Sequence, residues 1–171
     1  QNIESQRNRI IKCYYDYWSG NDFAFGIFGA ESKSFLGAIG LHPRTLNPRG
    51  LEIGYWTKSS VAGRGISTAA TQSLIVYGFE YLHLTRIQCG HNSQNFASAR
   101  VNDKCGFKIE GKFKNFEPSP TPKKKKNGFS ASNETVIRAL YPEDIGNLAW
   151  YAKAKTQVSV YDWQGEIVRA D

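Results

Sequence analysis

The stretch VAGRGISTAA, residues 61–70, has two glycines around an arginine, followed by small residues suited to the start of a helix. Glycines let the backbone approach a ligand closely, and the first N–H groups of a helix lack partners within it. With the positive end of the helix dipole, such N–H groups favour a phosphate or pyrophosphate. The stretch is no Walker loop and lacks the full GxGxxG fingerprint, so a plain tight turn stays open as the alternative.

The elements around this loop are predicted from hydrophobic periodicity. Apolar residues at steps of three and four, from Ile66 to Tyr81, predict a helix that begins at the loop and ends near Leu82. Gly106 is expected to end another helix, over 95–104. A helix over 3–18 is expected first, and strands are expected over 23–28, 34–42, 51–57, 86–91 and 107–113. This order predicts an α/β fold, a mixed sheet with helices packed on it.

Length and composition bound the class of protein. With 171 residues, of which 40% are hydrophobic, the chain suits one globular domain over 1–171. No apolar run reaches about 20 residues and the first residues lack a secretory signal, so we expect a soluble, cytoplasmic protein with no membrane partner. Cys13, Cys89 and Cys105 lack metal-ligand spacing, and the three histidines do not complete one, so we expect no metal site.

The net charge of +7 leaves several anionic partners open, because composition alone does not choose among them. Four of the positive charges stand together at Lys123–Lys126, within SPTPKKKKNG, which is typical of an exposed loop. We expect 117–133 to be a loop or connector. A solvated turn is one interpretation of the lysines, and a contact with an anion or with ribosomal RNA is the other.

A second motif, NFASARVNDKCGF at 95–107, follows the glycine loop. Together with EIGYW at 52–56 and GRGISTAA at 63–70, it resembles the GCN5-related N-acetyltransferase (GNAT) superfamily. Within that superfamily the motifs are most similar to the RimJ/RimL group, which acetylates ribosomal-protein N-termini. The resemblance is dense over the core, 23–113, and implies the mixed, mostly antiparallel GNAT sheet flanked by helices.

The resemblance implies acetyl-CoA as the cofactor. Ala62 stands where the family usually has Gln or Arg, and Ser67 where it has Gly or Ala, but neither change removes a backbone N–H from the pyrophosphate site. Asn95 is expected to cap its helix, and the resemblance adds a contact with the pantetheine arm. Trp56 fits a core position as well as a cofactor contact. The residues implied in cofactor binding are Tyr55, Trp56, Thr57, Ala62, Gly63, Arg64, Gly65, Ile66, Ser67, Asn95 and Ser98.

The resemblance also implies direct transfer in a ternary complex, which needs a proton acceptor for the amine and a donor for the thiolate. Glu117 follows the last core strand, where related enzymes place a catalytic glutamate, and is the first candidate acceptor. Glu52 on the central strand is the second. The structural alternatives are a surface carboxylate for Glu117 and a sheet-edge charge pair for Glu52. Ser98 matches a family serine near the CoA sulfur, unless its hydroxyl only bonds back to the preceding turn. Cys89 and Cys105 fit buried positions better than a nucleophile.

The ends of the chain fit the family less simply. Members begin with a strand and a helix before the helix that corresponds to 3–18, and this start is missing here. Residues 134–163 resemble the missing strand and helix, with Pro142 at the helix start, which predicts permuted or swapped terminal segments. A swap between copies would make the protein a homodimer. The other interpretation makes 134–141 the closing strand of the sheet.

The function that the resemblance implies is acetyl-CoA-dependent N-acetyltransfer. The acceptor expected first is a protein N-terminal amine, and a small amine, an aminoglycoside or a polyamine, is the alternative. The lysine run at Lys123–Lys126 would then supply a ribosome contact. The alternative function is a catalytically silent module that binds acyl-CoA or nucleic acid.

Overall fold

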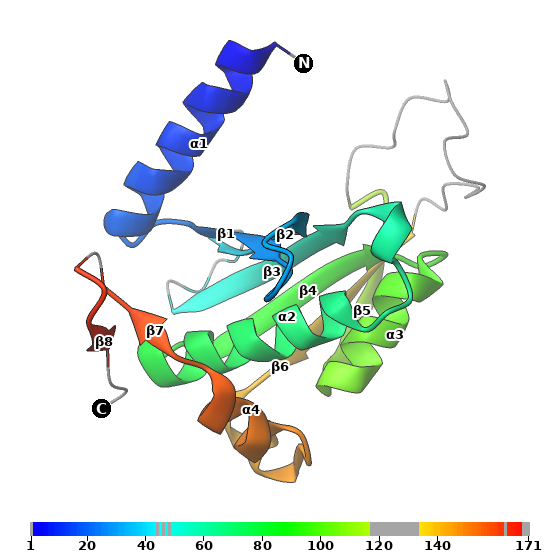
Figure 1. Cartoon of the computed structure of the whole chain (residues 1–171). Coiled ribbons are helices and arrows are strands. Elements are labelled where there is room, and N and C mark those ends of the chain that lie inside the picture. The colour runs from blue at the N-terminus through cyan, green and yellow to red at the C-terminus, as the bar shows by residue number, and fades with distance from the viewer. Residues whose placement is uncertain are drawn as a thin grey trace.

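The computed structural model describes residues 2–43, 45, 47, 49–116, 134–162 and 164–168 (Figure 1). The helices are α1 (Ile3–Trp18), α2 (Ile66–Val76), α3 (Phe96–Cys105) and α4 (Tyr151–Gln157). The strands of the main sheet are β1 (Phe23–Phe28), β2 (Phe35–His42), β3 (Gly50–Thr57), β4 (Arg86–Asn92), β5 (Lys108–Lys114) and β6 (Glu134–Leu140). The shorter elements are the 3-10 turns η1 (Ser59–Val61) and η3 (Pro142–Asn147), the π-helical turn η2 (Tyr77–Tyr81), and the paired strands β7 (Val160–Tyr161) and β8 (Ile167–Val168).

The main sheet has the strand order β1-β2-β3-β4-β6-β5. Every neighbouring pair is antiparallel except β3 and β4, which are parallel. The expected mixed, mostly antiparallel sheet is therefore confirmed. The strands expected within 23–113 are present, and α1 and α3 occupy the expected helical segments.

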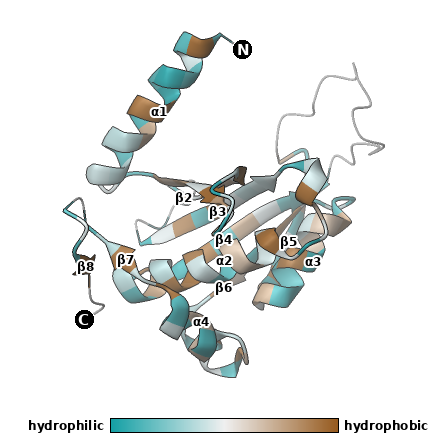
Figure 2. Ribbon diagram, viewed as in Figure 1, coloured by the Kyte–Doolittle hydropathy of each residue, from teal (hydrophilic) through white to brown (hydrophobic). Residues whose placement is uncertain are grey.

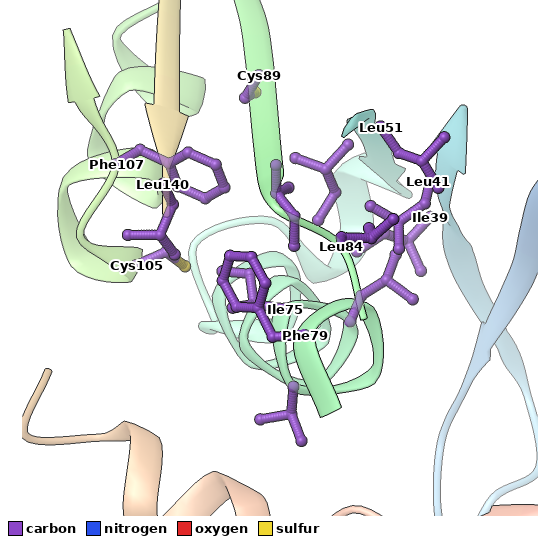
Figure 3. Close-up of a cluster of buried hydrophobic side chains, with 14 of the residues drawn as sticks. Ile39, Leu41, Leu51, Ile75, Phe79, Leu84, Cys89, Cys105, Phe107 and Leu140 are labelled. Atoms are coloured by element: carbon purple, nitrogen blue, oxygen red, sulfur yellow. The ribbon is translucent and has the colours of Figure 1, made fainter. Parts of the chain in front are cut away.

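The hydrophobic core lies between this sheet and α2. Leu41 on β2, Ile53 on β3 and Ile87 on β4 are almost wholly buried, and they cluster with Ile75 of α2 and Leu140 of β6. Figure 3 shows labelled members of this cluster gathered between the strands and the helix. Burying each such side chain stabilises the fold by about 1.5–3 kcal/mol. Because side chains alternate along a strand, the neighbours of these residues point to the opposite face of the sheet, called the helix-free face below because none of the described helices covers it.

The helix expected to reach Leu82 is present, but its last turn, η2, is π-helical. Gly78 in this turn lies against the sheet, since an added Cβ would be 2.9 Å from Cδ1 of Ile87 and 3.1 Å from Cδ1 of Leu84. The glycine therefore lets the helix approach β4 more closely than any larger residue would.

The segment 134–140, β6, is the closing strand of the sheet. β6 pairs with β4 on one side and β5 on the other, and its residues from Thr135 to Leu140 are buried. It does not pair with β1, and the permuted order considered from the sequence is not observed in the described residues. Pro142 begins the 3-10 helix η3, as expected for a helix start, and α4 begins four residues after that helix ends.

The helix α1 projects from the β1 edge, away from the other helices (Figure 1). Asn2 caps it by accepting a hydrogen bond from the backbone N–H of Glu4 at 2.9 Å, and none of its residues is buried. Its apolar residues, including Ile3 and Ile10, are exposed, as the brown segments of α1 in Figure 2 show. No helix in the described ranges is both long and apolar enough to cross a membrane.

Candidate active site

The two parallel strands at the centre of the sheet separate partway along their length. β3 and β4 pair only over Gly50–Glu52 and Arg86–Gln88, although β3 runs on to Thr57 and β4 to Asn92. The outer edge of β3 stays paired with β2 as far as Thr57. Beyond Glu52, the inner edge of β3 therefore presents backbone N–H and C=O groups to the space between the strands, where an extended ligand with amide groups can pair with them.

The glycine loop leads from the end of β3 to α2. Gly63 and Gly65 have φ angles of 77° and 81°, and an added Cβ at either position meets nothing within 4 Å. Gly65 is the N-cap of α2 and supplies no side-chain oxygen to the first turn. The first bond of this helix is donated by Ala69 to the carbonyl of Gly65, at 2.9 Å. The N–H groups of the preceding turn therefore point out of the helix end, as an anion site requires.

This loop borders a cleft of about 240 Å³ between the N-terminal end of α2 and one side of α3. Arg100 and Lys104, one turn apart on α3, line the cleft, and its described lining contains no carboxylate. Two cations and a helix N-terminus together favour an anionic ligand. The lining residues are Thr57, Val61, Ala62, Gly63, Gly65, Ile66, Ser67, Thr68, Ala97, Arg100, Val101 and Lys104.

Most of the residues expected to bind the cofactor come together here. Of the loop residues, Ala62, Gly63, Gly65, Ile66 and Ser67 line the cleft, and so does Thr57, whose Oγ1 lies 3.4 Å from Oγ of Ser67. The side chains of two expected residues lie elsewhere. Arg64 is exposed outside the lining, and Trp56 is 53% exposed, edge-on to Phe35. These two can contribute backbone groups to the site.

Asn95 and Ser98 lie at the start of α3, beside the gap between β3 and β4. Asn95 caps α3 by accepting a hydrogen bond from the N–H of Ser98 at 3.1 Å, as expected. The hydroxyls of Ser98 and Tyr55 are 3.0 Å apart. Burial raises the pKa of Tyr55, so its hydroxyl stays protonated and can donate to Ser98. That bond leaves the Ser98 proton available for another acceptor.

Of the two candidate proton acceptors, Glu52 and Glu117, the structure describes only Glu52. Glu52 lies on the helix-free face, where Nε2 of Gln88 donates to its Oε2 at 2.8 Å. Arg86 donates in turn to Oε1 of Gln88 at 2.9 Å, which fixes the amide that holds the carboxylate. Glu117 lies outside the described residues, as do Lys123–Lys126.

Cys89 and Cys105 are not placed to act as nucleophiles. Cys89 is 2% exposed and Cys105 is fully buried. Burial raises the pKa of the Cys89 thiol to about 11 and that of the Cys105 thiol to about 12. Both thiols are therefore protonated at neutral pH, and the thiolate is the reactive form. Within the ranges described, no three His, Cys, Asp or Glu side chains form a group that could hold a metal ion.

Sequence reasoning missed three polar contributors to this region. Arg100 and Lys104 carried a signal, since their spacing of four puts both on one face of the helix that follows the Asn95 cap. The signal for His42 was weaker: it follows Leu41, so alternation along the strand places its side chain on the face opposite the core. Its partner, Asp22, became apparent only with the hairpin, because the two residues are 20 apart in sequence.

Comparison with known proteins gives a family match over most of the chain. Residues 1–108 match the family described as the Acetyltransferase (GNAT) domain. "Probable N-acetyltransferase YjcK" of Bacillus subtilis (strain 168) is 33% identical over 110 residues, which cover 64% of this chain and 61% of that protein. "Putative ribosomal N-acetyltransferase YdaF" of the same organism is 42% identical over 79 residues, covering 46% and 43%. The chain therefore spans less than two thirds of the length of either relative.

A solved structure gives the same result for the fold. Mycobacterium smegmatis RimJ, in complex with CoA-disulfide, superposes with a TM-score of 0.69 at 25% identity. The superposition covers 82% of this chain and 63% of that one.

Proposed function

The chain belongs to the GNAT acetyltransferase family, and on this premise we propose that it transfers the acetyl group of acetyl-CoA to a primary amine. The observation that carries the proposal is the cleft at the start of α2. There, two glycines with open left-handed backbone precede an uncapped helix N-terminus, and Arg100 and Lys104 stand opposite. A pyrophosphate matches this combination of backbone donors and cations.

The residues present fit acetyl-CoA from its pyrophosphate to the end of its pantetheine arm. Loop residues from Ala62 to Ser67 would hold the pyrophosphate, and the inner edge of β3 beyond Glu52 would pair with the amides of the pantetheine arm. Asn95 and Ser98 would lie beside the end of that arm. When bound, acetyl-CoA supplies an acetyl group activated as a thioester.

The chain's own groups would handle the protons. The Ser98 hydroxyl, held by Tyr55, would donate to the departing sulfur. For the proton of the amine we keep both carboxylates as candidates, Glu117 and Glu52. Support for Glu52 comes from its fixed position, since Gln88 holds the carboxylate on the helix-free face at the point where β3 leaves β4.

A protein N-terminal amine is the acceptor that we propose first. The support is similarity to a protein named as a ribosomal N-acetyltransferase and to the structure of a RimJ protein. The net charge of +7 adds to this, because a basic protein is attracted to ribosomal RNA. We further propose that Lys123–Lys126 make that ribosome contact. A polyamine or aminoglycoside acceptor is the alternative substrate.

One experiment tests the reaction and the acceptor together. The purified protein is incubated with acetyl-CoA and, in separate wells, N-terminal peptides of ribosomal proteins, polyamines and aminoglycosides, and thiol release is followed. We expect release with the peptides and, at limiting acetyl-CoA, much slower release from the Gly65→Asp variant, which serves as the cofactor-site control. Stabilisation by CoA with no acceptor active would favour the silent binding module instead. Thiol release with polyamines alone would overturn the protein acceptor but keep the reaction.

The two carboxylates are separated by paired variants. Glu117→Gln and Glu52→Gln each remove one charge with little change of shape. The variant that lacks the proton acceptor should lose about 10²–10⁴-fold in kcat. CoA affinity, measured by titration, should stay unchanged in the variant that lost only the base. If both variants keep the wild-type rate, neither carboxylate accepts the proton.

The lysine run is tested by salt dependence. A variant with Ser at all four positions should bind ribosomes more weakly, and its log affinity should fall less steeply with log salt than that of the wild type. Acetylation of a short peptide should be unaffected. An unchanged salt slope would show that Lys123–Lys126 make no phosphate contacts.

A further inference from the structure

A histidine and an aspartate form a pair on the helix-free face of the sheet. Asp22 directly precedes β1 and His42 ends β2, and the antiparallel register that pairs Phe23 with Leu41 brings them together. Nδ1 of His42 lies 2.7 Å from Oδ1 of Asp22. An ionised carboxylate only accepts hydrogen bonds, so Nδ1 carries the proton and donates it to Asp22. Nε2 then keeps its lone pair, which makes it the basic atom of the ring.

His42 belongs to a polar row that crosses the centre of the sheet. It lies opposite Glu52 in the pairing of β2 with β3, and Glu52 lies opposite Gln88 in the pairing of β3 with β4. Leu41 and Ile53, the neighbours of the first two residues, are buried under the helices. His42 and Glu52 therefore share the other face, at the level where β3 and β4 stop pairing.

The imidazole ring lies across a floor of two glycines. An added Cβ at Gly40 would be 2.6 Å from Cε1 and 2.7 Å from Nε2 of His42, and one at Gly54 would be 3.6 Å from Nε2. The ring therefore lies over the paired glycines Gly40 and Gly54, with Nε2 nearer to Gly40 on β2. In the part of the chain that the structure describes, Nε2 has no hydrogen-bond partner, and the His42 side chain is 23% exposed.

We propose that His42, oriented by Asp22, accepts the proton of the amine that is acetylated, in place of Glu117 or Glu52; this rests on the acetyltransferase function proposed above. A histidine whose Nδ1–H is held by a carboxylate has its ring and tautomer fixed, as a general base requires. Of the acidic groups near the ring, Asp22 at the start of β1 contacts it directly, and Glu52 lies opposite His42 on the neighbouring strand β3.

The proton transfer balances with the acetyl transfer. The substrate ammonium gives one proton to Nε2, and the freed lone pair of the amine nitrogen bonds to the acetyl carbon. The C–S bond breaks and its electron pair stays on sulfur, which takes up the second amine proton through the Ser98 hydroxyl. The imidazolium then releases its proton to water, so each turnover yields one amide, one thiol and one free proton.

The alternative is a purely structural role, in which the hydrogen bond between Asp22 and His42 only stabilises the pairing of β1 with β2. The variants His42→Asn and His42→Gln distinguish the two roles. The asparagine amide can still donate to Asp22 from near the Nδ1 position, while neither amide accepts a proton at neutral pH. His83→Asn is the matched control, because His83 is exposed and has a φ of 49°, which asparagine tolerates.

The kinetic test uses kcat across pH with acceptors of graded amine basicity. Both His42 variants should lose about 10²–10⁴-fold in kcat for a strongly basic amine and should lose the rise in rate on the acid side. Their defect should shrink for a weakly basic amine that is already neutral, a change that a structural role would not produce. CoA titration and the His83→Asn rates should match the wild type.

Nitrogen NMR of the imidazoles supplies a readout that does not depend on activity. The chain has three histidines, so the His42 signals can be assigned by comparison with the variant. We expect a proton on Nδ1 and none on Nε2, with this tautomer lost in Asp22→Asn. A proton on Nε2 in the wild type would overturn the proposal.

The acetylation rates of the wild type and the variants distinguish a failure of this proposal from a failure of the proposed function. A wild-type protein that acetylates no amine would refute the proposed function and the role of His42 with it. An active wild type matched by both His42 variants would refute the role of His42 alone. The same follows if Glu52→Gln removes the acid-side rise and the His42 variants keep it, because Glu52 would then be the base.

Discussion

Replacing Gly65 separates charge from bulk at the candidate pyrophosphate site. Gly65 is the N-cap of α2 with a φ of 81°, and an added Cβ there meets nothing within 4 Å. Asparagine and aspartate have nearly the same shape, and both adopt left-handed backbone more readily than other non-glycine residues. Gly65→Asn therefore tests the added bulk, and Gly65→Asp adds one negative charge to the same bulk.

The added charge sets the size of the expected effect. A carboxylate at this position would lie beside the first-turn N–H groups, where the pyrophosphate would bind. Two unit charges 4 Å apart repel by about 1 kcal/mol in water and about 4 kcal/mol near a protein surface. Because the cleft is open to solvent, we expect a loss of about 1.4–2.8 kcal/mol, which weakens CoA binding by about 10- to 100-fold relative to Gly65→Asn.

Without ligand, the added charge should raise the stability of Gly65→Asp relative to Gly65→Asn, although it lowers the affinity for CoA. Left-handed backbone costs both variants about 1–2 kcal/mol relative to glycine. A carboxylate near the N-terminus of a helix recovers about 0.3–1 kcal/mol through the helix dipole. Without ligand, Gly65→Asp should therefore unfold at a temperature no lower than Gly65→Asn does, although it binds CoA more weakly.

Calorimetric titration with CoA and thermal unfolding, each at low and at physiological salt, measure both effects. The difference in CoA affinity between the two variants should shrink as salt is added, since salt screens exposed charges. Equal affinities of the two variants at low salt would refute the pyrophosphate site at α2. A lower unfolding temperature for Gly65→Asp would refute the argument from the dipole.

Two further predictions concern other contacts. Ser98→Ala should lower kcat by about 10- to 1,000-fold with CoA affinity nearly unchanged, and Tyr55→Phe should lower kcat less. Initial rates at saturating acetyl-CoA measure both effects. A wild-type rate for Ser98→Ala would exclude Ser98 as the proton donor. Burial acts to raise the pKa of Glu80, but hydrogen bonds from Lys155 and Tyr151 outweigh it and lower the pKa. This stabilisation is present above about pH 4.3 and is lost as pH falls through the folded pKa. Urea unfolding of Glu80→Gln should therefore show about 1–2 kcal/mol less stability at neutral pH and a flatter acid side; an unchanged curve would contradict this.

Local patterns in the sequence predicted the elements and the family. The strand bounds followed from runs of apolar and β-branched residues between turn residues, and the helix over 95–104 ended at Gly106 as expected, with a φ of 90° there. The motifs at 63–70 and 95–107 indicated GNAT membership, which the family match confirms. These features depend on neighbours in sequence, and so they can be read from it.

Features that depend on distant pairing were not predicted in the same way. The position of β6 is decided by which strands its edges bond, and the same apolar segment, 134–140, fits an opening or a closing strand. The Asp22–His42 pair depends on the register of the hairpin, and a register shift of one residue would separate the two side chains. The sequence assigned His42 no function because a histidine reveals its role only through the groups that hold its two nitrogens.

The divergence of β3 and β4 fits the direct transfer that we propose better than it fits a covalent enzyme intermediate. Residues 52 and 55 of β3 are an odd number apart, so alternation sends Glu52 to the helix-free face and Tyr55 to the face of α3. The acyl donor would approach along the side of Tyr55 and Ser98, and the amine along the side of Glu52 and His42. The opening between the strands is where the two would meet, and the nearest thiol, Cys89, is buried and protonated. A nucleophilic residue would have to lie in the opening itself, whereas a proton donor on one face and an acceptor on the other need only border it.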